Sequence, residues 1–159
     1  MTRSGRSPRL AGHCDEPYAE LHPADAQRLG IRDGSLVEVE SRWGSARVRA
    51  RVSADQHRGC VFVPIHWTAQ NSIRGRIGAV VNPVVDPVSG QPESKHTPVR
   101  VHPWPATWHG FLLSREAVDV DGLEYWSRAR ERGFWRYEIA GIAPWEDWRS
   151  VMQRVLGFD

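Results

Sequence analysis

The stretch GCVFVPIHWTAQNSIRGRIGAVVNPVVDPVSGQPESKHTPVRV, residues 59–101, decides the fold because it joins an apolar strand pattern to a long polar loop. Residues 60–65 (CVFVPI) form a continuous apolar run, which is typical of a fully buried strand. Pro64 either ends that strand or places it at the edge of a sheet. The loop that follows is far longer than an ordinary connection, and long polar loops usually carry function. We therefore expect functional residues in it.

Shorter patterns on both sides of this stretch predict a small, mainly β barrel. Residues 23–29 (PADAQRL) have helical spacing, and Gly30 is placed to end a short helix. Residues 36–41 alternate as a half-buried strand does, and residues 96–103 (HTPVRVHP) alternate again as a closing strand.

A further strand is predicted at residues 46–53 (ARVRARVS), where apolar residues alternate with arginines. One face of this strand should be buried, and the other should present Arg47, Arg49 and Arg51. The pattern favours a solvated strand face for these arginines over an anion-binding surface.

Composition restricts the classes of function. The 21 basic and 19 acidic residues give a formal net charge of +2, so charge does not indicate a nucleic-acid partner. Cys14 and Cys60 are too few for a disulfide framework and lack metal-ligand spacing, which fits reduced intracellular thiols and no metal site. No apolar run reaches transmembrane length, and residues 1–10 (MTRSGRSPRL) lack the hydrophobic stretch of a signal peptide. We therefore expect no membrane partner and a cytoplasmic location, unless an upstream part carries an export signal.

The composition changes at Trp104, because six of the eight tryptophans follow it or stand at it. Residues 120–133 (VDGLEYWSRARERG) predict a helix, residues 134–141 (FWRYEIAG) a strand, and residues 144–157 (PWEDWRSVMQRVLG) a second helix. The interleaved tryptophans and arginines could stack on nucleic acid, but the pattern favours packing against the barrel or a missing domain.

Three segments carry a resemblance to a known family: LHPADAQRLGIRDGSLVEVESRWG at 21–44, FVPIHW at 62–67, and NPVVDPVSGQPESKHTPVRV at 82–101. In this order they resemble the C-terminal cofactor-binding domain of molybdenum oxidoreductases of the dimethyl sulfoxide reductase superfamily, and most closely the assimilatory nitrate reductases. Residues 111–115, 125–129 and 134–141 also resemble the segment that follows this domain in those reductases.

The resemblance implies a six-stranded double-psi β-barrel with a short helix over residues 1–103. It leaves residues 104–159 as a small α/β, Trp-rich C-terminal extension that packs on the barrel or on a missing domain. Members of the family bind two molybdopterin guanine dinucleotide molecules, which together hold one molybdenum. The barrel contributes one part of a site that it shares with domains absent from this chain.

The residues that the resemblance places at this cofactor are Thr2, Arg3, Ser4, His66, Trp67, Asn71, Asn82, Glu93, Ser94 and Lys95. Lys95 is the one lysine of the chain. Taken singly, these residues also have ordinary explanations: His66 could bond a neighbouring carbonyl, Trp67 could be core, and Asn82 could cap a turn. The chain departs from the family at Gly78, where relatives commonly carry Asn or Asp, which removes one expected pterin contact.

The implied function is that of a C-terminal domain or fragment of an enzyme that reduces nitrate to nitrite. No catalytic residue is assigned to this chain, because the family's iron–sulfur and molybdenum ligands lie upstream, so we expect no nitrate reduction by this chain alone. The alternatives are a formate dehydrogenase-like parent enzyme, an interaction module, and a free-standing barrel enzyme such as a pyruvoyl-dependent decarboxylase. The last would need cleavage before a serine, for which the bonds preceding Ser35 and Ser45 are available.

Overall fold

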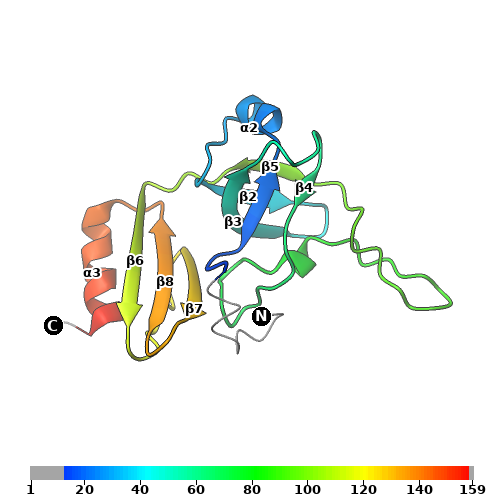
Figure 1. The fold of residues 1–159 in the computed structure, drawn as a ribbon. Helices are drawn as coiled ribbons and strands as arrows, with labels where there is room; N and C mark the ends of the chain where they lie inside the picture. The colour runs from blue at the N-terminus through cyan, green and yellow to red at the C-terminus, as the bar shows by residue number, and fades with distance from the viewer. Residues whose placement is uncertain (1–12, 158–159) are drawn as a thin grey trace.

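Five strands form a curved sheet in the first part of the chain (Figure 1). The computed structural model describes residues 13–157, apart from the side chains at 145–148, 151 and 154. The strands are β1 (Tyr18–Leu21), β2 (Leu36–Glu40), β3 (Ser45–Val52), β4 (Val61–Phe62) and β5 (Arg100–Pro103). Their order is β4-β1-β3-β2-β5; β1 and β3 are parallel, and the other neighbours are antiparallel. The predicted mainly β, barrel-like fold is confirmed.

Helix α2 (Pro23–Leu29) connects β1 to β2 and has the predicted bounds. It begins where the Nδ1 atom of His22 accepts a hydrogen bond from the Ala24 amide at 3.0 Å. It ends at Gly30, whose φ of 68° lies in the left-handed region that favours glycine.

The core of the first sheet lies on the face opposite the three arginines of β3. Val48 and Ala50 point into it, with Val37 and Val39 of the neighbouring strand. The loop after β4 returns to this core through a short 3-10 helix, η1 (Ile77–Ala79), which Val80 follows with 1% of its surface exposed. Apolar burial of this kind stabilises the barrel by about 1.5 to 3 kcal/mol for each large side chain.

The last part of the chain forms a second sheet, made of β6 (Trp108–Ser114), β7 (Tyr125–Arg130) and β8 (Trp135–Gly141) in the order β6-β8-β7. All its pairs are antiparallel. Helix α3 (Trp145–Leu156) covers one face, where Met152 and Val155 pack beside Tyr137 and other side chains of the sheet (Figure 1). The helix predicted at 144–157 and the strand predicted at 134–141 are therefore confirmed.

The other face of the second sheet meets the first sheet. Leu36 and Trp104 from the first part of the chain pack there against Tyr125 and Ala140. Arg47 of β3 lies in the same junction and is 9% exposed. Arg49 is half-buried, and only Arg51 is exposed. The predicted solvated arginine face is therefore wrong, because the second sheet covers most of it.

The helix predicted at residues 120–133 is also wrong, because these residues contain strand β7. Ser127 and Ala129 are buried on the face toward the first sheet, and Trp126 is buried on the face toward α3. A strand with both faces buried loses the alternation of apolar and polar residues that identifies a strand in sequence.

The apolar run at residues 60–65 forms a two-residue edge strand instead of a fully buried one. Phe62 and Cys60 are exposed. The edge position that Pro64 allowed is thus confirmed, since proline has no amide to continue a ladder.

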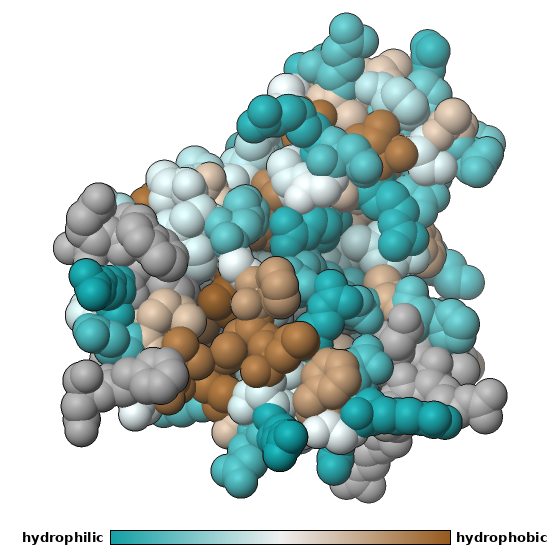
Figure 2. Space-filling view, turned by 60° about the vertical axis from the view of Figure 1, so that its left-hand side comes forward, coloured by the Kyte–Doolittle hydropathy of each residue, from teal (hydrophilic) through white to brown (hydrophobic). Residues whose placement is uncertain are grey.

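Strand β6 is also an edge strand, and two of its three exposed side chains are apolar. Phe111 is 71% exposed and Leu113 is exposed beside it. Figure 2 shows hydrophobic side chains gathered on the surface of this part of the molecule. Among residues 13–157, no helix has the length and apolar character needed to cross a membrane.

Candidate functional site

His66 and Trp67 lie directly after β4 and pack toward β1. The ring of Trp67 is 6.5 Å from that of Tyr18, edge to face, and 6.1 Å from that of His66. Trp67 is 6% exposed, so most of its ring belongs to the core. The Nδ1 atom of His66 is buried and has no hydrogen-bond partner among the described residues. A buried polar atom of this kind normally has a partner, which makes Nδ1 the atom of this pair best suited to a ligand.

Asn71 is placed by a turn that joins the loop to the second sheet. Its Oδ1 atom accepts a hydrogen bond from the Thr68 amide at 2.6 Å, and its backbone carbonyl accepts one from the Arg128 amide at 2.8 Å. Its side-chain oxygen therefore stabilises the turn.

Residues 82–97 form a projecting arm (Figure 1), and Asn82 is its first residue. Its Oδ1 atom accepts from the Val84 amide at 3.0 Å, and its own amide donates to the Oγ1 atom of Thr97 at 3.2 Å. The Asn82 side chain therefore caps a turn, which is the ordinary explanation given for it above.

The arm is ordered by its own hydrogen bonds. Asp86 accepts from the amides of Val88 and Ser89 and from the Ser89 hydroxyl, and these bonds lower the pKa of its carboxyl. Val85 and Pro92 form an isolated bridge across it. Val88 near its tip is 94% exposed. An arm that is preformed in this way loses little entropy when a ligand or partner covers it.

Glu93, Ser94 and Lys95 are exposed on the returning side of this arm. Within residues 13–157, no hydrogen bond or ion pair connects them to His66 or Trp67. Of the predicted cofactor residues that the structure describes, His66 and Trp67 therefore lie beside β1, Asn71 lies in a turn bonded to the second sheet, and the other four lie on the arm. Thr2, Arg3 and Ser4 lie outside the described residues.

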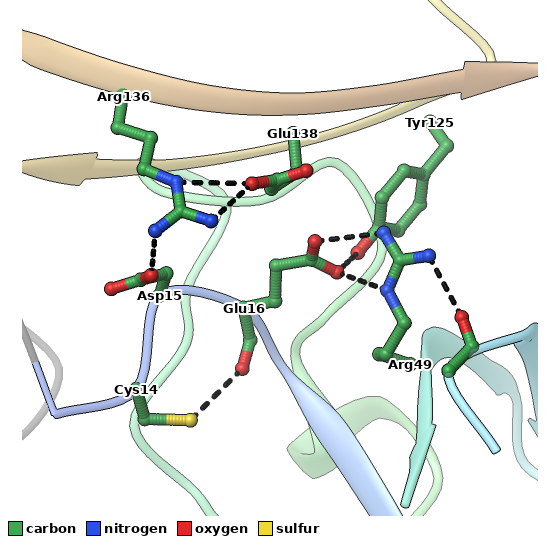
Figure 3. Close-up of polar contacts among 8 residues, drawn as sticks. Cys14, Asp15, Glu16, Arg49, Tyr125, Arg136 and Glu138 are labelled. Carbon is green, nitrogen blue, oxygen red and sulfur yellow. Dashed lines mark hydrogen bonds and ion pairs between the residues drawn. The ribbon is translucent and has the colours of Figure 1, made fainter. Parts of the chain in front are cut away.

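A cluster of charged side chains at the junction of the sheets was missed by the sequence reasoning (Figure 3). Glu16, just before β1, forms a bidentate pair with Arg49, with both N–O distances at 2.7 Å. The buried Tyr125 hydroxyl donates to Glu16 at 3.1 Å. Arg136 of β8 pairs with Asp15 and also with Glu138, the latter at 2.6 Å.

The pKa values of these groups follow from burial and from their partners. Burial raises the pKa of Tyr125 well above 10, and the nearby Glu16 carboxylate adds to the effect. Burial alone would lower the pKa of Arg49, but the ion pair with Glu16 outweighs it and the pKa is raised. Burial also raises the pKa of Glu138, against the opposing effect of Arg136. Tyr125 and Arg49 therefore hold their usual charge state more firmly, whereas Glu138 holds its negative charge less firmly. The arginines alternating along β3 were the one signal that could have indicated the cluster.

An open pocket of about 360 Å³ lies beside this cluster. Cys14, Tyr18, Arg51 and Arg136 are among its lining residues. The guanidinium of Arg51 lies 4.0 Å from the Tyr18 ring, and the other neighbours of that ring include Trp67. Burial raises the pKa of the Cys14 thiol, so this cysteine is not an activated nucleophile. Among the described residues, no group of three or more His, Cys, Asp or Glu side chains could hold a metal ion.

Comparison with known proteins gives three related findings. The family described as the molydopterin dinucleotide binding domain matches residues 1–98. Nitrate reductase of Klebsiella oxytoca is 39% identical over 148 residues, which cover 93% of this chain and 17% of that protein. Formate dehydrogenase H of Escherichia coli (strain K12) is 37% identical over 101 residues, which cover 63% of this chain and 13% of that protein.

Among solved structures, acetylene hydratase from Pelobacter acetylenicus is similar with a TM-score of 0.56. The match has 19% sequence identity and covers 64% of this chain and 16% of that one, so it shows a shared fold. This chain spans less than a fifth of the length of each of these three relatives.

Proposed function

Since this chain belongs to the molydopterin dinucleotide binding domain family, we propose that it grips molybdopterin guanine dinucleotide as one domain of a larger molybdenum oxidoreductase. The observation that carries the proposal is the extent of the family match, because it includes every residue predicted to contact the cofactor. In this proposal the first part of the chain is a six-stranded double-psi barrel that ends near residue 103.

The residues present fit such a ligand in their chemistry. A dinucleotide has a pyrophosphate and two planar ends rich in hydrogen-bonding groups. The buried Nδ1 atom of His66 would bond one of these planar ends, because it has no described protein partner. The exposed Lys95 supplies a compact cation for the pyrophosphate, with Ser94 beside it as a hydroxyl donor.

These side chains hold and orient the cofactor and take no part in electron transfer. The bound cofactor would supply the molybdenum-centred redox chemistry, in a site completed by other domains. Trp67 would support His66 from the core, and Asn71 and Asn82 would act through the turns that they stabilise. We further propose that Thr2, Arg3 and Ser4 contact the same ligand.

A parent enzyme that reduces nitrate to nitrite is favoured over a formate dehydrogenase-like one. The match to nitrate reductase covers 148 of the 159 residues and therefore includes the second sheet, whereas the match to formate dehydrogenase H covers only 101 residues. The partners proposed for this chain are therefore the remaining domains of a nitrate reductase-like polypeptide in the cytoplasm.

The test begins with the polypeptide that carries this sequence in its source cells, isolated with an antibody against the second sheet. Acid hydrolysis of the pyrophosphate should release GMP in about a one-to-one or two-to-one ratio to protein. Release of CMP would instead show that the bound cofactor is the cytosine dinucleotide. Neither nucleotide, on a polypeptide of only 18.0 kDa, would contradict the proposal and favour a free-standing barrel or an interaction module.

The contact residues are tested in the same polypeptide. His66→Ala and Lys95→Ala should each lower the nucleotide content several-fold, because each removes one polar contact worth about 1 to 3 kcal/mol. Arg58→Ala, an exposed arginine before β4, is the control and should leave the content unchanged.

A further inference from the structure

The loop after β4, residues 63–76, runs along the edge strand β7 of the second sheet. Ser72 and Ser127 form an antiparallel bridge there, and both are buried. Next to this bridge the Ile73 amide donates a hydrogen bond to the Trp126 carbonyl at 3.1 Å. The loop therefore pairs with β7 as a short additional strand does.

Arg128 of β7 holds two consecutive carbonyls of this loop. Its backbone amide donates to the Asn71 carbonyl at 2.8 Å, and the Nε atom of its side chain donates to the Gln70 carbonyl at 2.7 Å. The guanidinium carbon of Arg128 also lies 5.7 Å from the ring centroid of Trp126 and 5.3 Å from that of Trp135. Contact with these rings restricts the side chain, so its bond to the loop costs little further entropy.

The residues held by β7 are one turn away from His66 and Trp67. The amides of Asn71 and Ser72 each donate to the Thr68 carbonyl at 3.0 Å. Thr68 directly follows Trp67 in the chain. The side chain that the proposed function places at the cofactor is therefore connected to the second sheet through a single hydrogen-bonded turn.

The first sheet holds the other end of the loop. The Arg47 amide of β3 donates to the Arg74 carbonyl at 2.9 Å. Gly75 packs closely against Pro17, since an added Cβ atom would lie 2.7 Å from the Pro17 side chain. Among the described contacts, β3 and Pro17 thus fix the end of the loop nearer to η1, and β7 fixes the part nearer to His66.

We infer that β7 positions the loop after β4 for cofactor binding, and that Arg128 is a positioning residue that acts on His66 through Gln70 and Asn71. This inference rests on the proposed function, which places His66 at a planar end of the dinucleotide. A loop that is already held in its binding conformation loses less entropy when the ligand binds. The second sheet therefore favours cofactor binding without a contact between Arg128 and the ligand.

Hydrogen exchange in the 159-residue chain, without any ligand, tests whether β7 holds the loop. Arg128→Ala removes the side-chain bond to the Gln70 carbonyl and keeps the backbone of β7. The Ile73 amide should then exchange about three- to tenfold faster in NMR spectra, because the loop opens locally more often. The Ile31 amide, which donates to the Ala26 carbonyl at 2.8 Å, is the internal reference and should keep its rate.

Arg130→Ala is the matched control. Arg130 lies two positions further along β7, and its guanidinium carbon is 5.5 Å from the ring centroid of Trp135, but no described side-chain hydrogen bond joins it to the loop. This variant should exchange like the wild type at Ile73. The inference is overturned if Arg128→Ala leaves the Ile73 rate unchanged, if the Ile31 rate rises as much, or if Arg130→Ala has the same effect.

The action on His66 is read from the NMR resonances of its ring protons. The Trp67 ring lies 6.1 Å from the His66 ring, so its ring current makes these resonances sensitive to the relative placement of the two rings. Arg128→Ala should shift them, and Arg130→Ala should not. Unchanged resonances in Arg128→Ala would overturn the role of Arg128 in placing His66.

The consequence for binding is measured as the nucleotide content of the isolated parent polypeptide. Arg128→Ala should lower this content several-fold, and Arg130→Ala should leave it unchanged. An unchanged content in Arg128→Ala would overturn the positioning role. If the wild type carries no nucleotide, the proposed function fails, and the positioning role fails with it; the exchange rates still decide whether β7 holds the loop.

Discussion

Arg47 and Arg51 stand on the same face of β3, yet the structure gives them opposite environments. Arg47 donates to the Glu124 carbonyl at 2.8 Å, and its guanidinium lies 4.1 Å from the ring of Trp104. Arg51 is exposed, and its guanidinium lies over the ring of Tyr18. Replacing each by alanine therefore separates a covered arginine from a solvated one on a single strand.

The expected loss for Arg47→Ala follows from its contacts. A hydrogen bond from a charged donor contributes about 1.5 to 3 kcal/mol, and stacking on a desolvated aromatic ring contributes up to about 2 kcal/mol. Two costs reduce this sum by about 1 to 2 kcal/mol: the charge is buried, and the buried Nε atom has no hydrogen-bond partner among the described residues. We expect a net loss of about 2 to 3 kcal/mol for Arg47→Ala, and about 0.5 to 1 kcal/mol for Arg51→Ala.

Urea unfolding followed by circular dichroism measures both changes. With a slope of about 2 kcal/mol per molar urea, the midpoint should fall by about 1 to 1.5 M for Arg47→Ala and by less than about 0.5 M for Arg51→Ala. Two losses that agree within about 0.5 kcal/mol would refute the argument, because they would mean that the second sheet does not cover β3 in solution.

Three other predictions follow from local geometry. Gly141→Ala should cost about 1 to 3 kcal/mol in urea unfolding, because its Cβ atom would lie 2.6 Å from the Cε2 atom of Trp108, whereas Gly110→Ala makes only ordinary contacts at 3.5 Å and should cost less than about 1 kcal/mol; equal losses would contradict this. The exposed apolar side chains of edge strand β6 should make the wild-type chain self-associate at high concentration in sedimentation velocity, and Phe111→Lys should reduce this association because a charge protects an edge strand; a monomeric wild type or an undiminished association would contradict this. The Gly59 amide donates to the Asp25 carboxylate and lowers its pKa, so the contribution of Asp25 to stability is present above its ordinary pKa and is lost as the pH falls through the lowered pKa. Asp25→Asn should therefore flatten the decline of the urea midpoint below about pH 4, and an unchanged decline would contradict this.

The sequence alone was enough wherever a local signal was complete. Helix α2 has helical spacing and a glycine with positive φ at its end, and α3 likewise ends at Gly157 with a φ of 68°. Strands β2 and β3 were found because each alternates over one buried core. The family was identified from three sequence segments, and this identification did not need the structure.

Only the tertiary structure showed that residues 125–130 form strand β7 and that Arg47 and Arg49 of β3 are covered. Both depend on the second sheet, which buries one face of each, and burial by a distant element leaves no periodic mark in the local sequence. The predicted cofactor residues divide in the same way: the sequence proposes them through the family resemblance, but it does not show that His66 and Trp67 lie beside β1 while residues 93–95 lie on the arm.

Two contacts of the charged cluster at the junction of the sheets join residues that are 109 and 121 positions apart, Glu16 with Tyr125 and Asp15 with Arg136. A carboxylate and a guanidinium carry no information in sequence about which partner they will meet, because charge is non-directional and the chain between them can be of any length. The sequence therefore determined the family of this protein and those elements whose local signals are complete. Packing of one sheet on the other decided which charged residues became neighbours.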